Sequence, residues 1–185
     1  MLKVGVDEAG RGAWAGPLVA AAVLIDDAFD YDWSEVTDSK KLTKSKREKV
    51  LPIIQARVLS VGIGWVHANS IDKIGLQVAN QLAMRRAVTQ IDRPDAKLLL
   101  DGNIAYLQGA ETIIGGDALV PCISAASIIA KVFRDRFMCR LAEKYQNYGF
   151  DKHVGYGTAL HTAALKSYGV TRLHRHSYAP VKAFL

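Results

Sequence analysis

The feature that most constrains the fold is a short apolar strand that ends directly in two acids. Residues 2–6 are small and apolar enough to form a strand buried on both faces, and Asp7 and Glu8 follow at once. Adjacent buried carboxylates are costly unless positive charge lies beside them. Mg²⁺ or Mn²⁺ supplies that charge, because both prefer oxygen ligands. Since successive strand side chains point to opposite faces, we expect one acid to bind metal directly and the other to reach it where the strand twists into a loop.

A glycine-rich segment, Gly10-Arg11-Gly12, follows the two acids. Glycines let a backbone approach a ligand closely and expose N–H groups to it. A dinucleotide-binding loop is one alternative, but the spacing to Gly16 does not fit that fingerprint, and Pro17 stands where its helix should begin. A tight turn beside a surface ion pair is the other alternative.

A second strand ends in an acid about a hundred residues later. Residues 97–100 form a compact apolar strand, and Asp101 follows it, which repeats the arrangement at Asp7. In open α/β sheets, functional groups collect at strand ends, where the loops diverge. The repetition therefore predicts that Asp7 and Asp101 belong to one site.

Another acid lies among apolar residues of the longest predicted helix, residues 124–145. At 100° per residue, Asp135 falls on the same side as Ile128, Val132 and Met138. An acid in that position needs a partner. The partner is either a metal ion or a neighbouring cation, and the candidate cations are Lys131, Arg134 and Arg136.

Four acids on three elements are thus the candidate metal ligands: Asp7, Glu8, Asp101 and Asp135. Four carboxylates can hold two divalent cations ~3.5–4 Å apart, an arrangement that suits phosphodiester hydrolysis. No nucleophilic serine or cysteine motif accompanies them. The net charge of +6 favours a polyanionic partner, although many basic proteins simply carry solvated basic faces.

The rest of the chain predicts alternating strands and helices. We expect strands at 18–25 and 58–67, and a helix at 44–56 that Thr43 caps and Pro52 kinks or shortens. A helix at 71–91 should begin at Ser70. Its inward positions would be Ile74, Val78, Leu82, Ala83 and Ala87.

Towards the C-terminus the pattern predicts a turn at Gly115-Gly116-Asp117 and a short helix at 158–168. Between the long helix and this short one, residues 148–157 form a glycine-bounded loop with exposed aromatic side chains. The tail at 171–180 mixes Arg, His and Tyr in a way that suits contact with nucleic acid. The basic run at 40–49 is either a solvated face or a set of phosphate contacts.

The chain is expected to be one soluble, cytoplasmic, monomeric domain spanning residues 1–185. Cys122 and Cys139 are expected on one helix, roughly 25 Å apart, which is too far for a disulfide. The longest apolar run, residues 13–25, is too short to span a bilayer and does not follow a basic leader. We therefore expect no membrane partner.

Six segments resemble, in order, the motifs of type 2 ribonuclease H, and the match is closest to the bacterial ribonuclease HII branch. The resemblance runs from Val4 to Val181. It implies an α/β, ribonuclease H-like fold, in which a mixed β-sheet is flanked by helices, with a small helical, substrate-contacting C-terminal portion at about residues 147–185. The segments are GVDEAGRGAWAGPLVAAAV, DSKKL, LLLDGN, SAASIIAKVFRDR, GYGT..H and HRHSYAPV.

The resemblance also implies an endonuclease that uses Mg²⁺ or Mn²⁺ in a two-metal site. Its substrates would be RNA–DNA hybrids and duplex DNA that contains single ribonucleotides. Cleavage would fall 5′ to the ribonucleotide and leave a 3′-hydroxyl and a 5′-phosphate, in ribonucleotide removal and RNA primer processing.

The family's metal-binding carboxylates map onto the same four acids. Its GRG motif, which meets the ribonucleotide 2′-hydroxyl largely through backbone groups, maps to Gly10, Arg11 and Gly12. Tyr156 matches the tyrosine that senses the RNA–DNA junction by packing on the adjacent deoxyribose. Two lysines, Lys40 and Lys41, are expected near substrate phosphates.

Five positions depart from the family pattern: Thr37, Val154, Val170, His176 and Tyr178. None of these is one of the four acids. Loss of a positive charge at Val154 is expected to weaken substrate binding by up to roughly 1 kcal/mol. Lys131 matches a family lysine, with either a substrate role or an internal ion pair.

Two other functions are weighed against this one. A non-catalytic RNA- or hybrid-binding protein would explain the basic balance, but such a protein has no use for clustered carboxylates that repel phosphate. A two-metal nuclease or phosphatase acting on another substrate would share the acids. Comparing cleavage of an all-DNA duplex with cleavage of a single-ribonucleotide duplex distinguishes such an enzyme from a type 2 ribonuclease H.

Overall fold

The computed structural model describes residues 1–185, and a five-stranded mixed sheet lies at its centre. The strand order is β3-β2-β1-β4-β5. Strand β2 is antiparallel to both β1 and β3, whereas β4 is parallel to β1 and β5 is parallel to β4. The mixed sheet implied by the resemblance is therefore present. The strands are β1 (Leu2–Ala9), β2 (Leu18–Asp26), β3 (Ser60–Val66), β4 (Lys97–Asp101) and β5 (Glu111–Ile113).

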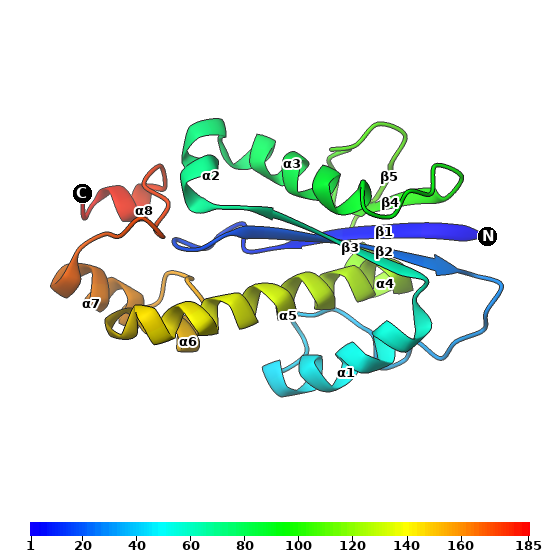
Figure 1. The fold of residues 1–185 in the computed structure, drawn as a ribbon, viewed down its shortest axis with the longest axis horizontal. Helices are drawn as coiled ribbons and strands as arrows, with labels where there is room; N and C mark the ends of the chain where they lie inside the picture. The colour runs from blue at the N-terminus through cyan, green and yellow to red at the C-terminus, as the bar shows by residue number, and fades with distance from the viewer.

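Helices cover both faces of the sheet (Figure 1). On one face α5 (Pro121–Lys144) crosses β1 and β2, and α1 (Lys44–Arg57) packs against α5. On the other face α3 (Leu76–Val88) lies over β1 to β3 and follows α2 (Ala68–Ile74). Each face encloses its own apolar core. The sheet is thus the middle of three layers.

Two glycines let the helices lie directly on the strands. A Cβ on Gly5 of β1 would come within 2.3 Å of the Cys122 backbone in α5, and one on Gly64 of β3 within 1.9 Å of the Ala83 carbonyl oxygen in α3. A side chain at either position would push the helix away. The close approach at Gly5 brings the first turns of α5 against β1.

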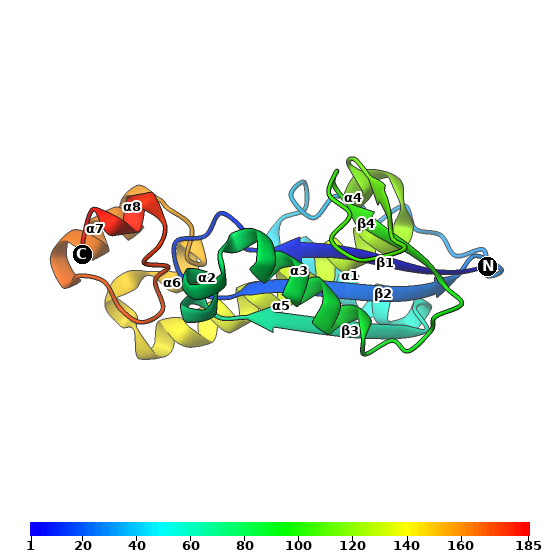
Figure 2. The same ribbon diagram turned by 90° about the horizontal axis from the view of Figure 1, so that it is seen from above.

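The C-terminal portion lies beyond one end of the sheet (Figure 2). Its own small core includes Tyr148, Phe150 and Leu165, packed with Met138 of α5. The expectation of exposed aromatics at 148–157 is wrong for Tyr148 and Phe150, which are buried. The elements here are a 3₁₀ turn (Gln146–Tyr148), α6 (Phe150–His153), α7 (Ala159–Tyr168) and α8 (Ala179–Lys182).

Two predicted elements differ from the structure in their bounds. Strand β1 continues to Ala9, so both acids lie inside the strand and not in the following loop. The helix predicted at 71–91 is two helices, because Gly75 separates α2 from α3 with a φ of 78°. This break turns Ile74 and Val78 outward, and both are exposed.

Helix α1 confirms its predicted cap and, to within one residue, its predicted range of 44–56, and Pro52 does not shorten it. The hydroxyl of Thr43 accepts a hydrogen bond from the Lys46 N–H, and the helix continues through Pro52 to Arg57. Both cysteines lie on α5 and neither forms a disulfide. None of the helices combines the length and hydropathy needed to cross a bilayer.

Candidate active site

Parallel pairing of β1 with β4 brings two of the predicted acids together. The register pairs Val6 with Leu100, so Asp7 and Asp101 are the next residues along the two neighbouring strands. Because the strands are parallel and in register, the two side chains lie on the same face of the sheet. That face is the one covered by α5, where Ser127 lies close enough to Asp7 to lower its pKa slightly and shares a hydrogen bond with Ser39 at 2.8 Å.

A third acid, Asp117, completes this group, although the sequence predicted only a turn at its position. Carboxylate oxygens of Asp7, Asp101 and Asp117 lie within 4.8 Å of one another. Asp117 is in the short helix α4 (Gly116–Leu119), and its N–H donates to Asp101 Oδ1 at 3.4 Å. The sequence signal for Asp117 is the same as that for Asp7 and Asp101, an acid soon after a strand. Strand β5, however, has only three residues and leaves little periodicity to detect.

Asp135 does not join this group, which corrects the expectation for it. Its carboxylate accepts from Lys131 at 2.9 Å and from Arg47 of α1 at 3.4 Å, so it is the internal ion pair that the sequence left open. Asp135 is eight residues beyond Ser127 on α5, which corresponds to about 12 Å along the helix. The helix therefore carries Asp135 away from the sheet end where Asp7 lies.

Glu8 lies on the opposite face of β1 from Asp7, as strand alternation predicted. Its carboxylate accepts from the Arg11 guanidinium at 3.3 Å. Burial raises the pKa of Glu8, and Arg11 and Asn80 partly offset this. The Asn80 amide on α3 is fully buried, but its geometry falls short of a hydrogen bond and leaves both polar atoms unpaired.

The electrostatics of Asp7 fit a bound cation. Burial raises the pKa of Asp7 well above its usual range, and the neighbouring carboxylates of Glu8 and Asp101 raise it further. Only one cation pairs with the group: Lys40, whose mostly exposed side chain reaches Asp117 at 3.0 Å. One ammonium at the rim cannot balance three clustered acids, and the nearby Arg11 pairs with Glu8 and not with them, so the residues present suit divalent metal ions.

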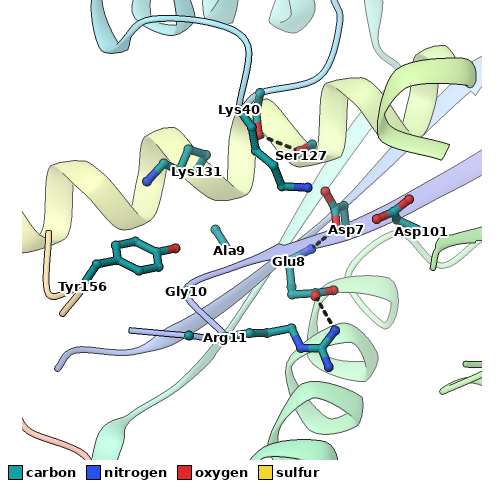
Figure 3. A pocket seen from close by; sticks show the side chains of 12 residues that line it. Asp7, Glu8, Ala9, Gly10, Arg11, Lys40, Asp101, Ser127, Lys131 and Tyr156 are labelled. Atoms are coloured by element: carbon teal, nitrogen blue, oxygen red, sulfur yellow. Dashed lines mark hydrogen bonds and ion pairs between the residues drawn. The ribbon is translucent and has the colours of Figure 1, made fainter. Parts of the chain in front are cut away.

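The acids lie at one end of a cleft of about 670 Å³ (Figure 3). Its floor is the end of β1, and Ser127 and Lys131 of α5 form one side. Figure 3 shows Tyr156 across the cleft from Asp101. The predicted substrate residues that line the cleft are Gly10, Arg11, Gly12, Lys40 and Tyr156. Lys41 is exposed and does not line it.

The two glycines of the Gly10-Arg11-Gly12 segment have different reasons to be glycine. Gly10 has a φ of 93°, and a Cβ there would lie 2.1 Å from Arg134 Nε. Gly12 faces open space, with nothing within 4 Å of its Cβ position. Gly10 is thus needed to build the loop, whereas Gly12 leaves backbone accessible from the cleft.

Two buried arginines, Arg134 and Arg175, fix the loop at residues 10–17. The sequence did not predict this supporting role for either of them. Arg134 of α5 donates to the carbonyls of Pro17, Ala15 and Val154 at 2.8 to 3.1 Å. Neither Arg134 nor Arg175 pairs with a carboxylate, and burial lowers the pKa of Arg134 to about 10. The carbonyl contacts are thus what hold these two cations in the interior.

Arg175 acts on the same loop from the C-terminal tail. Its guanidinium donates to the Gly16 carbonyl at 3.1 and 3.2 Å and to the Arg11 carbonyl at 2.8 Å. The Tyr178 hydroxyl also donates to the Arg11 carbonyl, at 2.6 Å. The expectation that the tail contacts nucleic acid does not suit Arg175 or His174, because both are buried.

Tyr156 and Lys131 meet at the far end of the cleft. The Lys131 ammonium and the Arg134 guanidinium each lie 5.2 Å from the centre of the Tyr156 ring, within cation–π range. Lys131 therefore forms the internal ion pair with Asp135 that the sequence left open, and it also lies in the cleft wall.

The fold and the grouping of carboxylates at the sheet end define a ribonuclease H-like protein. The crystal structure of ribonuclease H2 from Pyrococcus horikoshii matches with a TM-score of 0.79 and 28% identity, over 100% of this chain and 97% of that one. Bst-RNase HIII in complex with Mn²⁺ has the same fold, with a TM-score of 0.78 and 18% identity over 98% of this chain and 68% of that one.

Sequence comparison narrows the class to one family. The family model for ribonuclease HII matches residues 4–181. Ribonuclease HII of Dichelobacter nodosus is 48% identical over 183 residues, which cover 98% of this chain and 96% of the relative. The chain belongs to the ribonuclease HII family, and it is a metal-dependent endonuclease that cleaves the RNA strand of RNA–DNA hybrids.

Proposed function

We propose that this ribonuclease also cuts 5′ to single ribonucleotides embedded in duplex DNA and leaves a 3′-hydroxyl and a 5′-phosphate. The observation that supports this most is the composition of one cleft. It combines the acids of the sheet end, the backbone of Gly10 to Gly12, and Tyr156. Such an activity would serve ribonucleotide removal and RNA primer processing.

We further propose that Asp7, Asp101 and Asp117 hold the metal ions, with Glu8 reaching the site from the other face of β1. The relative with bound Mn²⁺ supports Mn²⁺ or Mg²⁺ as the cofactor. Two such ions, when bound, activate the attacking water and stabilise the leaving oxygen. Lys40 at the rim would bind a flanking phosphate once metal ions neutralise Asp117.

Recognition would come from the other end of the cleft. Backbone groups of Gly10 to Gly12 would meet the 2′-hydroxyl, which is the group that distinguishes RNA from DNA. The Tyr156 ring would pack on the neighbouring deoxyribose, where a 2′-hydroxyl would crowd it. Exposure of Gly12 and the half-buried Tyr156 ring support these roles. The monomeric state, single-domain organisation and cytoplasmic location stay predictions.

An assay on three end-labelled duplexes tests the proposal: one with a single ribonucleotide, one all-DNA, and one RNA–DNA hybrid. With Mg²⁺ or Mn²⁺ we expect one cut, 5′ to the ribonucleotide, and no cut in all-DNA. Polymerase extension checks the 3′-hydroxyl, and ligation checks the 5′-phosphate. Asp101→Asn should abolish cleavage. Asp95→Asn, which removes an exposed acid paired with Arg93, is the matched control.

Cutting of the hybrid without cutting at the single ribonucleotide would refute the proposed specificity but leave the family activity in place. Equal cutting of the all-DNA duplex would indicate a nuclease of broader substrate range. Binding without any cleavage, unchanged in Asp101→Asn, would indicate a non-catalytic binding protein.

A further inference from the structure

Three buried histidines lie together in the C-terminal portion, outside the acidic site. His153 ends α6, His161 is in α7, and His174 is in the tail, and all three are buried. The rings of His153 and His161 stack with centroids 4.4 Å apart, and Nε2 of His161 lies 3.0 Å from Nε2 of His174. Ring nitrogens that face each other at this distance can bond only if one is protonated and the other is not.

The hydrogen bonds at the two ends of the His161–His174 pair fix the proton positions. At one end the Thr171 N–H donates to His174 Nδ1 at 3.0 Å, so the neutral His174 ring carries its proton on Nε2. That Nε2–H donates to His161 Nε2, which leaves the His161 proton on Nδ1. At the other end His161 Nδ1 lies 3.0 Å from the Tyr156 carbonyl oxygen, which can only accept.

Both ends therefore require the same direction of hydrogen-bond donation. This chain of hydrogen bonds runs from the donor at Thr171 through His174 and His161 to the acceptor at Tyr156. A proton added to either ring would place two N–H groups face to face. Burial lowers the pKa of both rings to about 4. Repulsion from His153 lowers the pKa of His161 further, and repulsion from His161 lowers that of His174. The pair is thus neutral at physiological pH.

The groups that surround the pair do not supply a compensating negative charge. His153 is itself neutral, since its Nδ1 accepts from the Gly155 N–H and its Nε2 faces the Tyr148 carbonyl. The neutral rings of Trp14 and Phe150 pack against His161. Among charged or titratable groups nearby, Asp151 and His176 lie on exposed positions, and Tyr148 and Tyr156 are phenols.

The backbone of Tyr156 is held tightly on every side. Its carbonyl also accepts from the Thr158 N–H at 3.0 Å, and its N–H donates to the His153 carbonyl at 2.9 Å. The glycines on either side touch the segment that follows the GRG loop. A Cβ on Gly155 would lie 2.3 Å from the Ala15 carbonyl oxygen, and one on Gly157 would lie 2.1 Å from the Trp14 ring.

We propose that His161 and His174 are positioning residues that hold Tyr156 in the cleft through this directed chain of hydrogen bonds. The proposal rests on the role of Tyr156 in substrate discrimination proposed above. In this arrangement the tail contributes to specificity from the interior, without touching nucleic acid at His174.

Two substitutions of His161 separate its hydrogen bond to Tyr156 from its hydrogen bond to His174. The amide of Asn lies as many bonds from Cβ as Nδ1 does, so His161→Asn keeps a donor for the Tyr156 carbonyl. The amide of Gln corresponds to Nε2, so His161→Gln keeps a partner for His174 but loses the bond to Tyr156. Ser167→Ala, at an exposed position on α7, is the control.

Kinetics on the single-ribonucleotide duplex and the hybrid give the first readout. We expect His161→Gln to lower the ratio of kcat/KM on the single-ribonucleotide duplex to that on the hybrid by about five- to tenfold. His161→Asn and Ser167→Ala should stay within about twofold of wild type. In a Tyr156→Ala background His161→Gln should have no further effect, because both substitutions act on one element. Equal losses in His161→Asn and His161→Gln would overturn the proposal.

Hydrogen exchange of the backbone at residues 155–158 gives a readout that is independent of substrate. We expect faster exchange in His161→Gln and unchanged exchange in His161→Asn. Unchanged exchange in His161→Gln would overturn the positioning role. If exchange changes as expected but Tyr156→Ala leaves the kinetic ratio unaltered, the fault lies with the proposed role of Tyr156 and not with the histidines.

The wild-type protein provides a test that needs no variant to fold. Imidazole ¹⁵N spectra near pH 7 should show His161 protonated on Nδ1 and His174 on Nε2, both neutral. The reverse tautomers, or a charged ring at that pH, would contradict the directed chain.

Discussion

The sheet end and the C-terminal portion build opposite walls of one cleft by different means. At the sheet end, like charges are forced together: strand register places Asp7 beside Asp101, and the pKa of Asp7 rises because of burial and neighbouring acids. In the C-terminal portion and the part of α5 that packs against it, buried cations and rings are satisfied by backbone carbonyls, as for Arg134 of α5 and His161 of α7. The acids of the sheet end repel one another until a cation binds, whereas the buried polar groups of the other region already have their hydrogen-bond partners.

The difference shows where stability and function compete. Removal of charge from the sheet end should stabilise the metal-free fold and destroy catalysis. Removal of polar groups from the C-terminal portion should weaken the fold and affect chemistry only through the position of loops. The following substitutions separate these two behaviours.

The largest effect should come from Asp7→Asn. Loss of a proposed metal ligand should lower kcat by at least about 100-fold. Because the pKa of Asp7 is raised, its ionised form destabilises the fold at neutral pH, so the variant should melt at a higher temperature in EDTA. Asp135→Asn should do the opposite and lower the melting temperature, because it leaves the buried Arg47 guanidinium without its carboxylate partner. Equal shifts in melting temperature for Asp7→Asn and Asp135→Asn would contradict the view that Asp7 destabilises the metal-free fold while Asp135 stabilises it.

Arg134→Met should cost about 3 kcal/mol or more in the free energy of unfolding. The substitution leaves the carbonyls of Pro17, Ala15 and Val154 without their donor inside the protein. Arg136→Met is the matched control, because its exposed pair with Glu48 should contribute at most about 1 kcal/mol. Urea unfolding measures both. A similar small cost for the two would show that the carbonyl cage contributes little.

Acid should weaken the C-terminal portion through the histidine pair. The pKa of each ring is about 4 in the fold and 6.5 without it, so the unfolded chain binds more protons between these values. Stability is unaffected above pH 6.5 and is lost as the pH falls towards 4, by at most about 3 kcal/mol per ring. Urea midpoints from pH 7 to pH 5 should fall more steeply in wild type than in His161→Asn/His174→Asn. Parallel curves would contradict the neutral pair.

The smallest effect should come from Tyr178→Phe. Only one of the two donors to the Arg11 carbonyl is lost, and Arg175 remains. We expect about 1 kcal/mol in the free energy of unfolding and a change of less than about fivefold in kcat/KM on the single-ribonucleotide duplex. A loss as large as that of Arg134→Met would show that the hydroxyl, and not the guanidinium, fixes the loop.

Local signals predicted much of the fold. Strands β1 and β4 were found because apolar runs end in acids, and the start of α1 because a threonine precedes a polar helix. The signals failed where distant contacts decide. Gly75 splits a helix whose periodicity reads as continuous, and Tyr148 and Phe150 are buried by packing against α5 and α7.

The candidate site was predicted in part for the same reason. Asp7, Glu8 and Asp101 were identified from their place at strand ends, which is a local property. An acid among apolar residues favours Asp135 as a metal ligand, yet that pattern describes a buried ion pair with Arg47 equally well. Asp117 follows a strand of three residues and two glycines, so only the fold brings it to the other acids.

The central claim is that Asp117, and not Asp135, completes the metal site with Asp7 and Asp101. Calorimetric titration of Mn²⁺ into wild type, Asp117→Asn and Asp135→Asn tests it without substrate. We expect Asp117→Asn to weaken binding by at least about tenfold and Asp135→Asn to bind within about threefold of wild type. Wild-type affinity in Asp117→Asn, together with weakened binding in Asp135→Asn, would contradict the account.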